Sequence, residues 1–370
     1  MRIGIDIKCL RYNKAGIGRY LRSILDELQE TDHQNEYFLF TPAATDYKPK
    51  NSNFNVFVCK SKIRQPGILW QQFTLPLFIR KNKIDVFWGP EQTLPLHKIK
   101  GTSKVLTVHD FVYKRFPKTM AKSVLFINRH FGSKSIKVAD YICPVSNFTK
   151  QELCKFFPKT NENKIRIVCN GVKADHVQSA QKRGSELLFV GSLEPRKNLK
   201  NLLIALETLH GKGLDIPLVL TGPKGWKNAS IKKLLEKSPI AKNIRHLGYV
   251  SETELELLYE TCAAVVFPSL YEGFGLPVLE AFAHGAPVLT TKGSVMEDIA
   301  GKYAYYFKAT EPQSIADTIE KFYQERTSFE IKNAERDSGI AKILNKYSWE
   351  HSAKALLKVF EEACEKRTAQ

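Results

Sequence analysis

Residues 267–281 read FPSLYEGFGLPVLEA, and this stretch decides the fold. A strand is predicted to end at Phe267, a loop follows, and Pro277 stands near the first helical position, the place in a helix that tolerates proline best. Gly273 and Gly275 precede that helix, so their N–H groups can face a ligand with no side chain in the way. The stretch therefore predicts a strand, a glycine loop and a helix, in that order.

The same order occurs at the start of the chain and recurs along it. Residues 3–7 alternate as a strand does, Gly16 and Gly18 follow, and the apolar residues of 17–28 form one stripe of an amphipathic helix. Further strands are predicted at 37–40, 56–59, 86–88, 105–108, 141–145, 165–168, 187–190, 218–220, 244–247 and 263–267. Strands that alternate with helices and short glycine turns predict an α/β fold with parallel sheets, which bind ligands at the carboxyl ends of their strands.

The length of 370 residues predicts two domains, since domains commonly hold roughly 100 to 200 residues. Residues 173–185 are polar and lack periodicity, which places the boundary there. We expect an N-terminal domain over 1–172, a C-terminal domain over 173–345, and a closing helix over 346–370 that can pack back on the N-terminal domain. Hydrophobic residues make up 43% and charged residues 25%, which excludes disordered, collagen-like and disulfide-scaffold classes.

The positive charge is concentrated in the first half of the chain. Residues 1–172 hold 29 Lys and Arg against 13 Asp and Glu, whereas residues 173–370 hold 27 against 25. Such a field attracts nucleic acid, an acidic lipid surface or a phosphorylated substrate, although a basic surface without a specific partner explains it too. Within 118–137, apolar residues alternate with basic ones and predict an amphipathic helix, which either rests on anionic headgroups or faces the core. Its basic residues are Lys118, Lys122, Arg129, Lys134 and Lys137.

The cysteines and the apolar runs indicate a location. Seven cysteines without paired short spacing are typical of thiols in a reducing compartment. No apolar run approaches the roughly 20 residues that a spanning helix needs, and residues 1–7 are too short and polar for a signal peptide. We therefore expect a cytoplasmic protein whose membrane contact, if it has any, is peripheral.

The first glycine loop resembles the dinucleotide-binding fingerprint only in part. Leu21 stands where that fingerprint has its third glycine, and no acidic residue ends a clear second strand at the right distance. This argues against an NAD site. Two interpretations stay open: Gly16 and Gly18 let a phosphate approach the helix start, or they only permit a tight turn.

Two glutamates flank the helix start in the opening stretch. Glu272 lies on the loop before the helix, and Glu280 lies about one turn inside it. Carboxylates accept hydrogen bonds from pairs of sugar hydroxyls, so this pair would suit a glycosyl unit and a ribose linked through phosphates. Taken alone, two glutamates eight residues apart could equally be ordinary helix-surface residues.

With the flanking Pro268-Ser269 and the later AHGAPV at 283–288, the chain resembles the family-4 retaining glycosyltransferases. The resemblance implies the GT-B architecture, in which two Rossmann-like domains with parallel sheets face each other across a cleft. It covers nearly the whole chain, and it also rests on GIGRY at 16–20, HD at 109–110, VSNFT at 145–149, NGV at 170–172 and VGSLEPRKN at 190–198.

The resemblance also implies roles for particular residues. Glu272 would contact hydroxyls of the donor sugar, Glu280 would bind the ribose hydroxyls, and His109 would lie near the reacting sugar. His284 is more simply explained as a structural residue at a helix end. The remaining expected donor contacts are Arg196 and Lys197 at the diphosphate, the loop of Gly16 and Gly18, and the segment Gly273, Phe274, Gly275 and Leu276.

Breaking a sugar–phosphate bond builds negative charge on the leaving nucleoside diphosphate, which preorganised cations can stabilise. The other common glycosyltransferase architecture holds a metal with an Asp-any-Asp motif, which is missing from this sequence. We therefore expect no cofactor and no metal, with Arg196 and Lys197 as the stabilising cations. Many relatives have an arginine where this chain has Ser192, which leaves open which of the two cations matters more. The resemblance implies retention of configuration through front-face attack.

The variants GIGRY and EPRKN are similar to those of bacterial mannosyltransferases that use GDP-mannose. This implies a glycan or lipid-linked glycan acceptor, made for lipopolysaccharide O-antigen or exopolysaccharide, and a peripheral position on the inner face of the cytoplasmic membrane. One alternative is the same fold with a UDP-sugar carrying glucose, N-acetylglucosamine or galactose. Another is a non-catalytic nucleic-acid-binding protein, although the sequence carries no recognised RNA or DNA motif.

Overall fold

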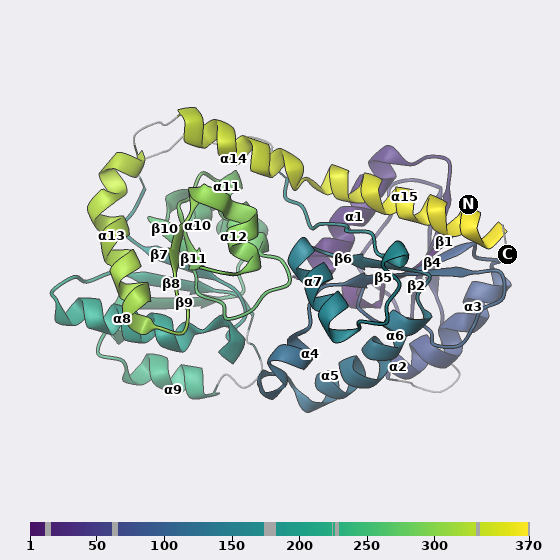
Figure 1. Cartoon of the computed structure of the whole chain (residues 1–370), viewed down its shortest axis with the longest axis horizontal. Coiled ribbons are helices and arrows are strands. Elements are labelled where there is room, and N and C mark those ends of the chain that lie inside the picture. The colour runs from purple at the N-terminus through teal and green to yellow at the C-terminus, as the bar shows by residue number, and fades with distance from the viewer. Residues whose placement is uncertain are drawn as a thin grey trace. The chain divides into compact units, whose positions relative to one another are not determined.

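The computed structural model describes residues 1–11, 16–60, 66–173, 183–223, 225, 229–330 and 334–368 (Figure 1). The chain divides into two compact units. Unit 1 comprises Met1–Lys114, Lys122–Gly171 and Trp349–Gln370, and unit 2 comprises Arg115–Ala121 and Val172–Ser348. Each unit contains a six-stranded sheet in which every pair of neighbouring strands is parallel, so the predicted α/β fold of two Rossmann-like domains is confirmed.

The sheet of unit 1 has the strand order β3-β2-β1-β4-β5-β6. Its two halves run outward from the neighbouring strands β1 and β4, so the order reverses between them. Strands β4, β5 and β6 are buried along their whole length, as expected for a parallel sheet with both faces covered. The strands are β1 (Arg2–Asp6), β2 (Glu36–Thr41), β3 (Phe54–Val58), β4 (Val86–Gly89), β5 (Ser103–Val108) and β6 (Tyr141–Pro144).

Two long helices pack together in unit 1. Helix α1 (Ile17–Thr31) buries the predicted apolar stripe, and α15 (Trp349–Thr368) packs on α1 and β5 (Figure 1). The Ser103 hydroxyl donates a 2.7 Å hydrogen bond to the Ala363 carbonyl, which joins the closing helix to the sheet. The other helical segments are η1 (Lys8–Arg11), α2 (Gly67–Leu69), the π-helical turn η2 (Trp70–Thr74), α3 (Leu75–Lys81), α4 (Val112–Arg115), η3 (Pro117–Thr119), α5 (Lys122–Ile127), the π-helical turn η4 (Asn128–Gly132), α6 (Ser133–Val138), α7 (Asn147–Phe156) and η5 (Glu162–Lys164).

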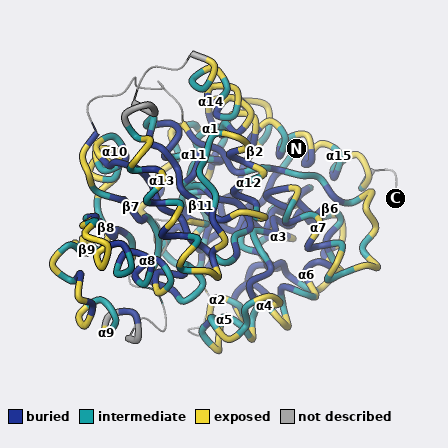
Figure 2. Tube along the Cα trace, turned by 60° about the vertical axis from the view of Figure 1, so that its left-hand side comes forward, coloured by how far each residue is buried: buried dark blue, intermediate teal, exposed yellow. Residues whose placement is uncertain are grey.

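Unit 2 repeats the topology with the strand order β12-β11-β10-β7-β8-β9, so its order reverses between β7 and β10. The buried side chains of α8 and α13 belong to one core cluster with those of the sheet. Strands β8, β10 and β11 are buried along their whole length, whereas Figure 2 shows the edge strand β9 largely exposed. The strands are β7 (Leu187–Val190), β8 (Leu218–Thr221), β9 (Ile244–Gly248), β10 (Ala264–Phe267), β11 (Val288–Thr291) and β12 (Tyr305–Phe307). The helices are η6 (Pro195–Lys197), α8 (Leu199–Gly211), α9 (Ala229–Lys237), η7 (Ala241–Asn243), α10 (Glu252–Thr261), α11 (Leu276–Ala283), α12 (Val295–Ala300), η8 (Gly301–Tyr303), α13 (Pro312–Glu330) and α14 (Ala334–Lys346).

The structure corrects two local predictions. Residues 165–168 form no strand: Ile165 makes a single bridge to Ile142, because β6 ends at Pro144, which has no N–H to continue the ladder. The helix predicted over 118–137 begins at Lys122, and Lys118 lies in the preceding turn, which belongs to unit 2. The strands β11 and β12 were not predicted.

The division between the units falls between Gly171 and Val172, one residue before the end of the predicted N-terminal domain. Most of the polar stretch predicted as the boundary, residues 174–182, lies outside the described residues. All seven cysteines are free thiols, and four of them are buried.

Candidate functional site

Three predicted site residues meet in unit 2, where the strand order reverses. Arg196 and Lys197 follow β7, and Glu272 follows its neighbour β10. Arg196 Nη1 lies 2.8 Å from Glu272 Oε2, and Lys197 Nζ lies 2.7 Å from Glu272 Oε1. The three side chains are only 12%, 12% and 13% exposed. Ligands of open α/β sheets bind at this edge, so the topology and the charges indicate one site.

A second carboxylate orients Arg196. Glu194 Oε2 lies 3.6 Å from Arg196 Nη2, and Glu194 Oε1 accepts a 2.7 Å hydrogen bond from the Ser192 hydroxyl. Arg196 also donates a 2.7 Å hydrogen bond to the Tyr271 carbonyl, one residue before Glu272. Ser192, which stands where many relatives have arginine, therefore contributes through Glu194. The sequence interpretation gave Glu194 no role, although it lies within the EPRKN motif.

Asn198 fixes the loop that carries both cations. Its backbone is left-handed, with φ of 61°, and its side-chain amide donates to the carbonyls of Pro268 at 3.1 Å and Ala309 at 2.7 Å. Pro268 directly follows β10, so the buried amide ties the loop after β7 to the loop that carries Glu272. Asn198 was also missed as a contributor to the site.

The ion pairs set the protonation of the site. Burial disfavours the ionised form of Glu272, but the charges of Arg196 and Lys197 outweigh it and lower the pKa of Glu272 to about 2. Burial lowers the pKa of Lys197; Glu272 opposes this shift and Arg196 adds to it. At neutral pH the site therefore presents the Glu272 carboxylate between two cations. A phosphate group can share these two cations with the carboxylate.

The glycine loop ends at the start of α11. The helix begins at Leu276, with Pro277 as its second residue, and its N-cap Gly275 provides no side-chain cap. Phe274 is buried and packs edge-to-face on Tyr347, with ring centroids 5.6 Å apart. The first N–H groups of a helix have no partner within the helix, so this helix start can donate hydrogen bonds to an anion or a sugar oxygen.

Glu280, one turn into α11, is held by a residue that the sequence interpretation missed. The buried hydroxyl of Tyr259, on α10, donates a 2.6 Å hydrogen bond to Glu280 Oε2. The Tyr259 ring stacks on His284, with centroids 5.6 Å apart and planes 4° apart. His284 Nδ1 also lies 3.6 Å from Glu260 Oε1, so its contacts fit the structural role expected for it.

Gly16, Gly18 and His109 belong to unit 1. Gly16 caps α1 with φ of 56° and ψ of −115°, a conformation that L side chains rarely adopt, and no side chain caps this helix start. Gly18 is buried within α1, and the preceding Lys14 and Asn13 lie outside the described residues. Within the described residues the start of α1 has no side-chain cap, a geometry compatible with both sequence interpretations of this loop, the phosphate site and the tight turn.

His109 follows β5 and is held by two contacts. Its Nε2 lies 2.7 Å from the Pro90 carbonyl, which can only accept, so Nε2 carries the proton. The ring packs edge-to-face on Tyr20, with centroids 5.0 Å apart and planes at 87°. Burial lowers the pKa of His109 below its usual value. The side chain is therefore neutral at pH 7, with Nδ1 as a hydrogen-bond acceptor.

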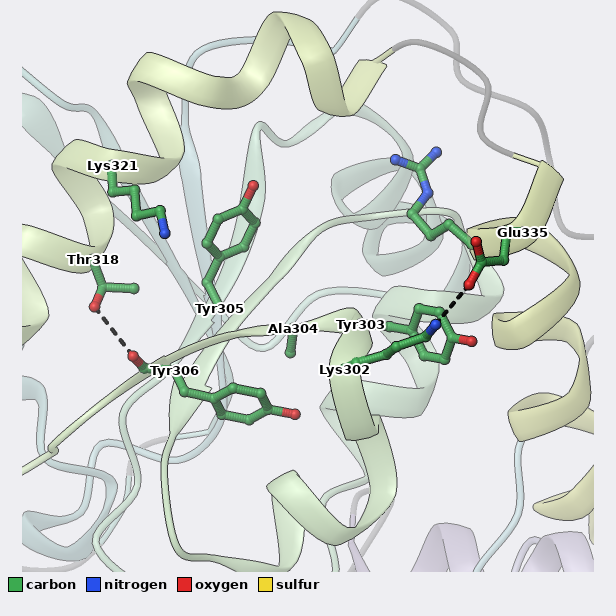
Figure 3. A pocket seen from close by; sticks show the side chains of 9 residues that line it. Lys302, Tyr303, Ala304, Tyr305, Tyr306, Thr318, Lys321 and Glu335 are labelled. Carbon is green, nitrogen blue, oxygen red and sulfur yellow. Dashed lines mark hydrogen bonds and ion pairs between the residues drawn. The ribbon is translucent and has the colours of Figure 1, made fainter.

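A pocket of about 510 Å³ lies elsewhere in unit 2 (Figure 3). It flanks the edge strand β12, and none of the predicted site residues lines it. Within the described ranges, no cluster of three or more His, Cys, Asp or Glu side chains is arranged for a metal ion. Among the helices that the structure describes, none combines the length and the apolar character needed to cross a membrane.

Two six-stranded parallel sheets of this strand order fit the GT-B class of glycosyltransferases. Residues 15–176 match the family model "Glycosyltransferase Family 4", and residues 173–338 match "Glycosyl transferases group 1". Together the two models span most of the chain. The protein belongs to the family-4 glycosyltransferases, and the resemblance seen in the sequence is confirmed.

Several relatives and solved structures match this chain, and three of them illustrate a match over almost its whole length. The O-antigen chain mannosyltransferase B of Escherichia coli is 27% identical, over 95% of this chain and 97% of the relative. Sucrose-phosphate synthase from Thermosynechococcus elongatus superposes with a TM-score of 0.75 at 14% identity, over 98% of both chains. HepE from Anabaena, solved in complex with UDP-glucose, superposes with a TM-score of 0.70 at 14% identity over the whole of both chains. At such identities the two structures show the shared fold.

Proposed function

We propose that this glycosyltransferase moves mannose from GDP-mannose to a glycan or lipid-linked glycan acceptor of a bacterial surface polysaccharide, with retention of configuration. The main support is the cluster of Arg196, Lys197 and Glu272, which lies where the strand order of the unit 2 sheet reverses. Two cations beside a helix start suit a diphosphate, and the nearby carboxylate suits the hydroxyls of the sugar attached to it.

The reaction breaks the bond between the sugar C1 and the diphosphate oxygen, and it forms a bond from C1 to an acceptor oxygen. The acceptor proton passes to the departing phosphate oxygen. Arg196 and Lys197 stabilise the charge that develops on the diphosphate, and the contacts of Glu194 and Asn198 fix the loop that carries them. His109, neutral and with Nδ1 as an acceptor, would receive a hydrogen bond from a sugar hydroxyl.

The similarity to an O-antigen mannosyltransferase over nearly the full length supports mannose as the sugar and O-antigen as the product. A UDP-sugar remains the alternative donor, and HepE, which shares the fold, was solved with UDP-glucose. A thermal-shift titration separates the two, because a ligand that binds the folded form raises its melting temperature. We expect GDP to raise the melting temperature more than UDP at equal concentration. A larger increase with UDP would indicate a UDP-sugar as the donor. Family membership argues against a nucleic-acid-binding protein.

The exposed surface of unit 1 supports a peripheral position on the inner face of the cytoplasmic membrane. Lys122, Arg129, Lys134 and Lys137 are exposed, and the side chain of Phe126 among them is 55% exposed. A second exposed stripe, Leu69, Phe73 and Leu77, runs along α2, η2 and α3. Basic and apolar groups together favour anionic lipid surfaces. In vesicle flotation at low salt, we expect recovery with anionic vesicles and little with neutral ones; equal recovery would remove the membrane from the proposal.

We also propose that catalysis needs no divalent metal, since Arg196 and Lys197 supply the charge stabilisation. Transfer is expected to continue at an unchanged rate in EDTA. Loss of transfer in EDTA, followed by recovery with magnesium or manganese, would assign the stabilisation to a metal ion.

A further inference from the structure

Unit 1 contains a buried polar cluster at the position that corresponds to the candidate donor site of unit 2. Lys8 follows β1, and Glu91 follows the neighbouring strand β4, just as Lys197 follows β7 and Glu272 follows β10. Lys8 Nζ lies 2.7 Å from Asp6 Oδ2, at the end of β1, and also contacts the Glu91 carboxylate. The strand order reverses here too, so the cluster lies where open α/β sheets bind ligands.

Gln71 adds an unsatisfied acceptor to this cluster. Its Nε2 donates to Asp6 Oδ2 at 2.8 Å and to the Thr93 carbonyl at 3.2 Å. The side chain is fully buried, and within the described part of the chain its Oε1 has no hydrogen-bond partner. Buried acceptors are rarely left unpaired because this lowers stability, so a persisting one indicates a place where a ligand or water supplies the donor.

The backbone around the cluster is unusual on both sides. Gln71 lies in the π-helical turn Trp70–Thr74, and Gln92, next to Glu91, is a non-glycine residue with φ of 65°. Both features are concentrated at functional sites. Glu91 also lies between two residues that hold the His109 loop: the Pro90 carbonyl accepts from His109, and Gln92 Nε2 donates 2.8 Å to the Asp110 carbonyl. The cluster is therefore joined to the loop proposed to contact the reacting sugar.

The charge of the cluster selects the kind of ligand. One cation, Lys8, faces two carboxylates, Asp6 and Glu91, and the Gln71 oxygen adds another acceptor. Acceptors exceed donors here, although the first half of the sequence is strongly basic. An excess of acceptors favours a ligand that donates hydrogen bonds, such as the hydroxyls of an uncharged sugar, and repels a phosphate.

We propose that Asp6, Lys8, Gln71 and Glu91 form a binding site for the hydroxyl groups of the acceptor sugar. Glu91, whose side chain is 23% exposed, makes the direct contact. Asp6 is fully buried and acts with Lys8 to position the Glu91 carboxylate. This inference rests on the proposed glycosyl transfer and assigns the acceptor side of that reaction.

The test uses the full chain, a nucleotide-sugar donor and a fluorescently tagged mannotriose as acceptor probe. Glu91→Gln keeps the size of the side chain but removes the charge, and it is expected to raise the KM for mannotriose at least tenfold. The KM for the donor is expected to change less than twofold. Gln71→Met removes the unpaired oxygen together with the Nε2 hydrogen bonds to Asp6 and the Thr93 carbonyl. It provides a second variant and is expected to raise the acceptor KM at least threefold.

Tyr37→Phe is the matched control. It removes another buried hydrogen bond of unit 1, the 2.5 Å bond from the Tyr37 hydroxyl to Asp32, and it should alter neither KM. An unchanged acceptor KM in both Glu91→Gln and Gln71→Met would overturn the inference. So would a wild-type enzyme that is saturated by a phosphorylated acceptor but not by neutral mannotriose. Failure of the proposed function is distinct, because wild-type enzyme would then release no nucleoside diphosphate from any nucleotide sugar.

Discussion

The Lys197 ammonium lies 2.7 Å from the Glu272 carboxylate, and the Arg196 guanidinium lies 2.8 Å from the same carboxylate. In the proposed complex the donor diphosphate competes with Glu272 for these two cations. Glu272 therefore has two opposing effects: it weakens diphosphate binding by neutralising the cations, and it contributes to transfer through contacts with the sugar. The first four predictions concern these three side chains.

Glu272→Gln is expected to separate binding from transfer. Because the competing charge is removed, the Kd for GDP, measured by titration calorimetry, should be no weaker than that of the wild type. Turnover should fall at least about a hundredfold, the scale expected when a charged contact of the transition state is lost. Glu186→Gln is the control, since Glu186 forms an exposed ion pair with Arg245 in the same unit. Weaker GDP binding together with normal turnover would contradict the assignment.

Lys197→Ala is expected to impair both properties. Loss of the cation should weaken GDP binding and reduce turnover at least about a hundredfold, because less charge stabilisation reaches the leaving diphosphate. Arg196 still neutralises Glu272 in this variant, so we expect the fold to persist, as checked by circular dichroism and thermal melting. Near-normal turnover in a folded Lys197→Ala protein would place the diphosphate elsewhere.

The lowered pKa of Lys197 predicts that enzyme activity is lost at a lower alkaline pH than an ordinary lysine would allow. Because its pKa is lowered, Lys197 loses its proton at a pH below the ordinary lysine pKa of 10.5. As pH rises, kcat/KM for the donor should therefore begin to decrease before pH 10.5 is reached. Arginine stays charged over this range, so Lys197→Arg should move the alkaline limb to higher pH. Identical alkaline limbs in the two proteins would show that another group titrates.

Glu272 has a different pH signature, in stability. Its pKa in the folded protein is about 2, below the ordinary 4.5, so the carboxylate stabilises the folded state above pH 4.5. That contribution should be lost as pH falls from 4.5 towards 2. Urea unfolding at several pH values should show a smaller loss over this interval in Glu272→Gln than in the wild type. An equal loss in both would mean that Glu272 is not held as the ion pairs indicate.

Tyr259→Phe tests the contact at the proposed ribose carboxylate. The Tyr259 hydroxyl holds Glu280 at 2.6 Å, so its loss should free the carboxylate and weaken recognition of ribose hydroxyls. The measurement is the ratio of the Kd values for 2′,3′-dideoxy-GDP and GDP, which we expect to fall at least threefold in Tyr259→Phe and further in Glu280→Gln. If the ratio is unchanged in Tyr259→Phe but reduced in Glu280→Gln, the Tyr259 hydroxyl does not contribute to ribose recognition and the residue serves only in packing. Ratios unchanged in both would move the ribose away from Glu280.

The strand pattern predicted the architecture because strands and helices alternate with strong local periodicity. Val288–Thr291 and Tyr305–Phe307 were missed because they are short and their neighbours in the sheet, not their own pattern, make them strands. The pairing of Arg196 and Lys197 with Glu272 joins residues about 75 positions apart, and motifs alone predicted that they share a site without predicting their contacts. Tyr259 and Glu91 carried no local signal, since their roles depend on which strands and helices become neighbours.

The most direct test of the central claim is a crystal structure with a non-hydrolysable GDP-mannose analogue. We expect the diphosphate within hydrogen-bond distance of Arg196 and Lys197, the mannose hydroxyls at Glu272, and the ribose hydroxyls at Glu280. An analogue bound with its diphosphate away from both cations, or held by unit 2 residues other than these, would contradict the account.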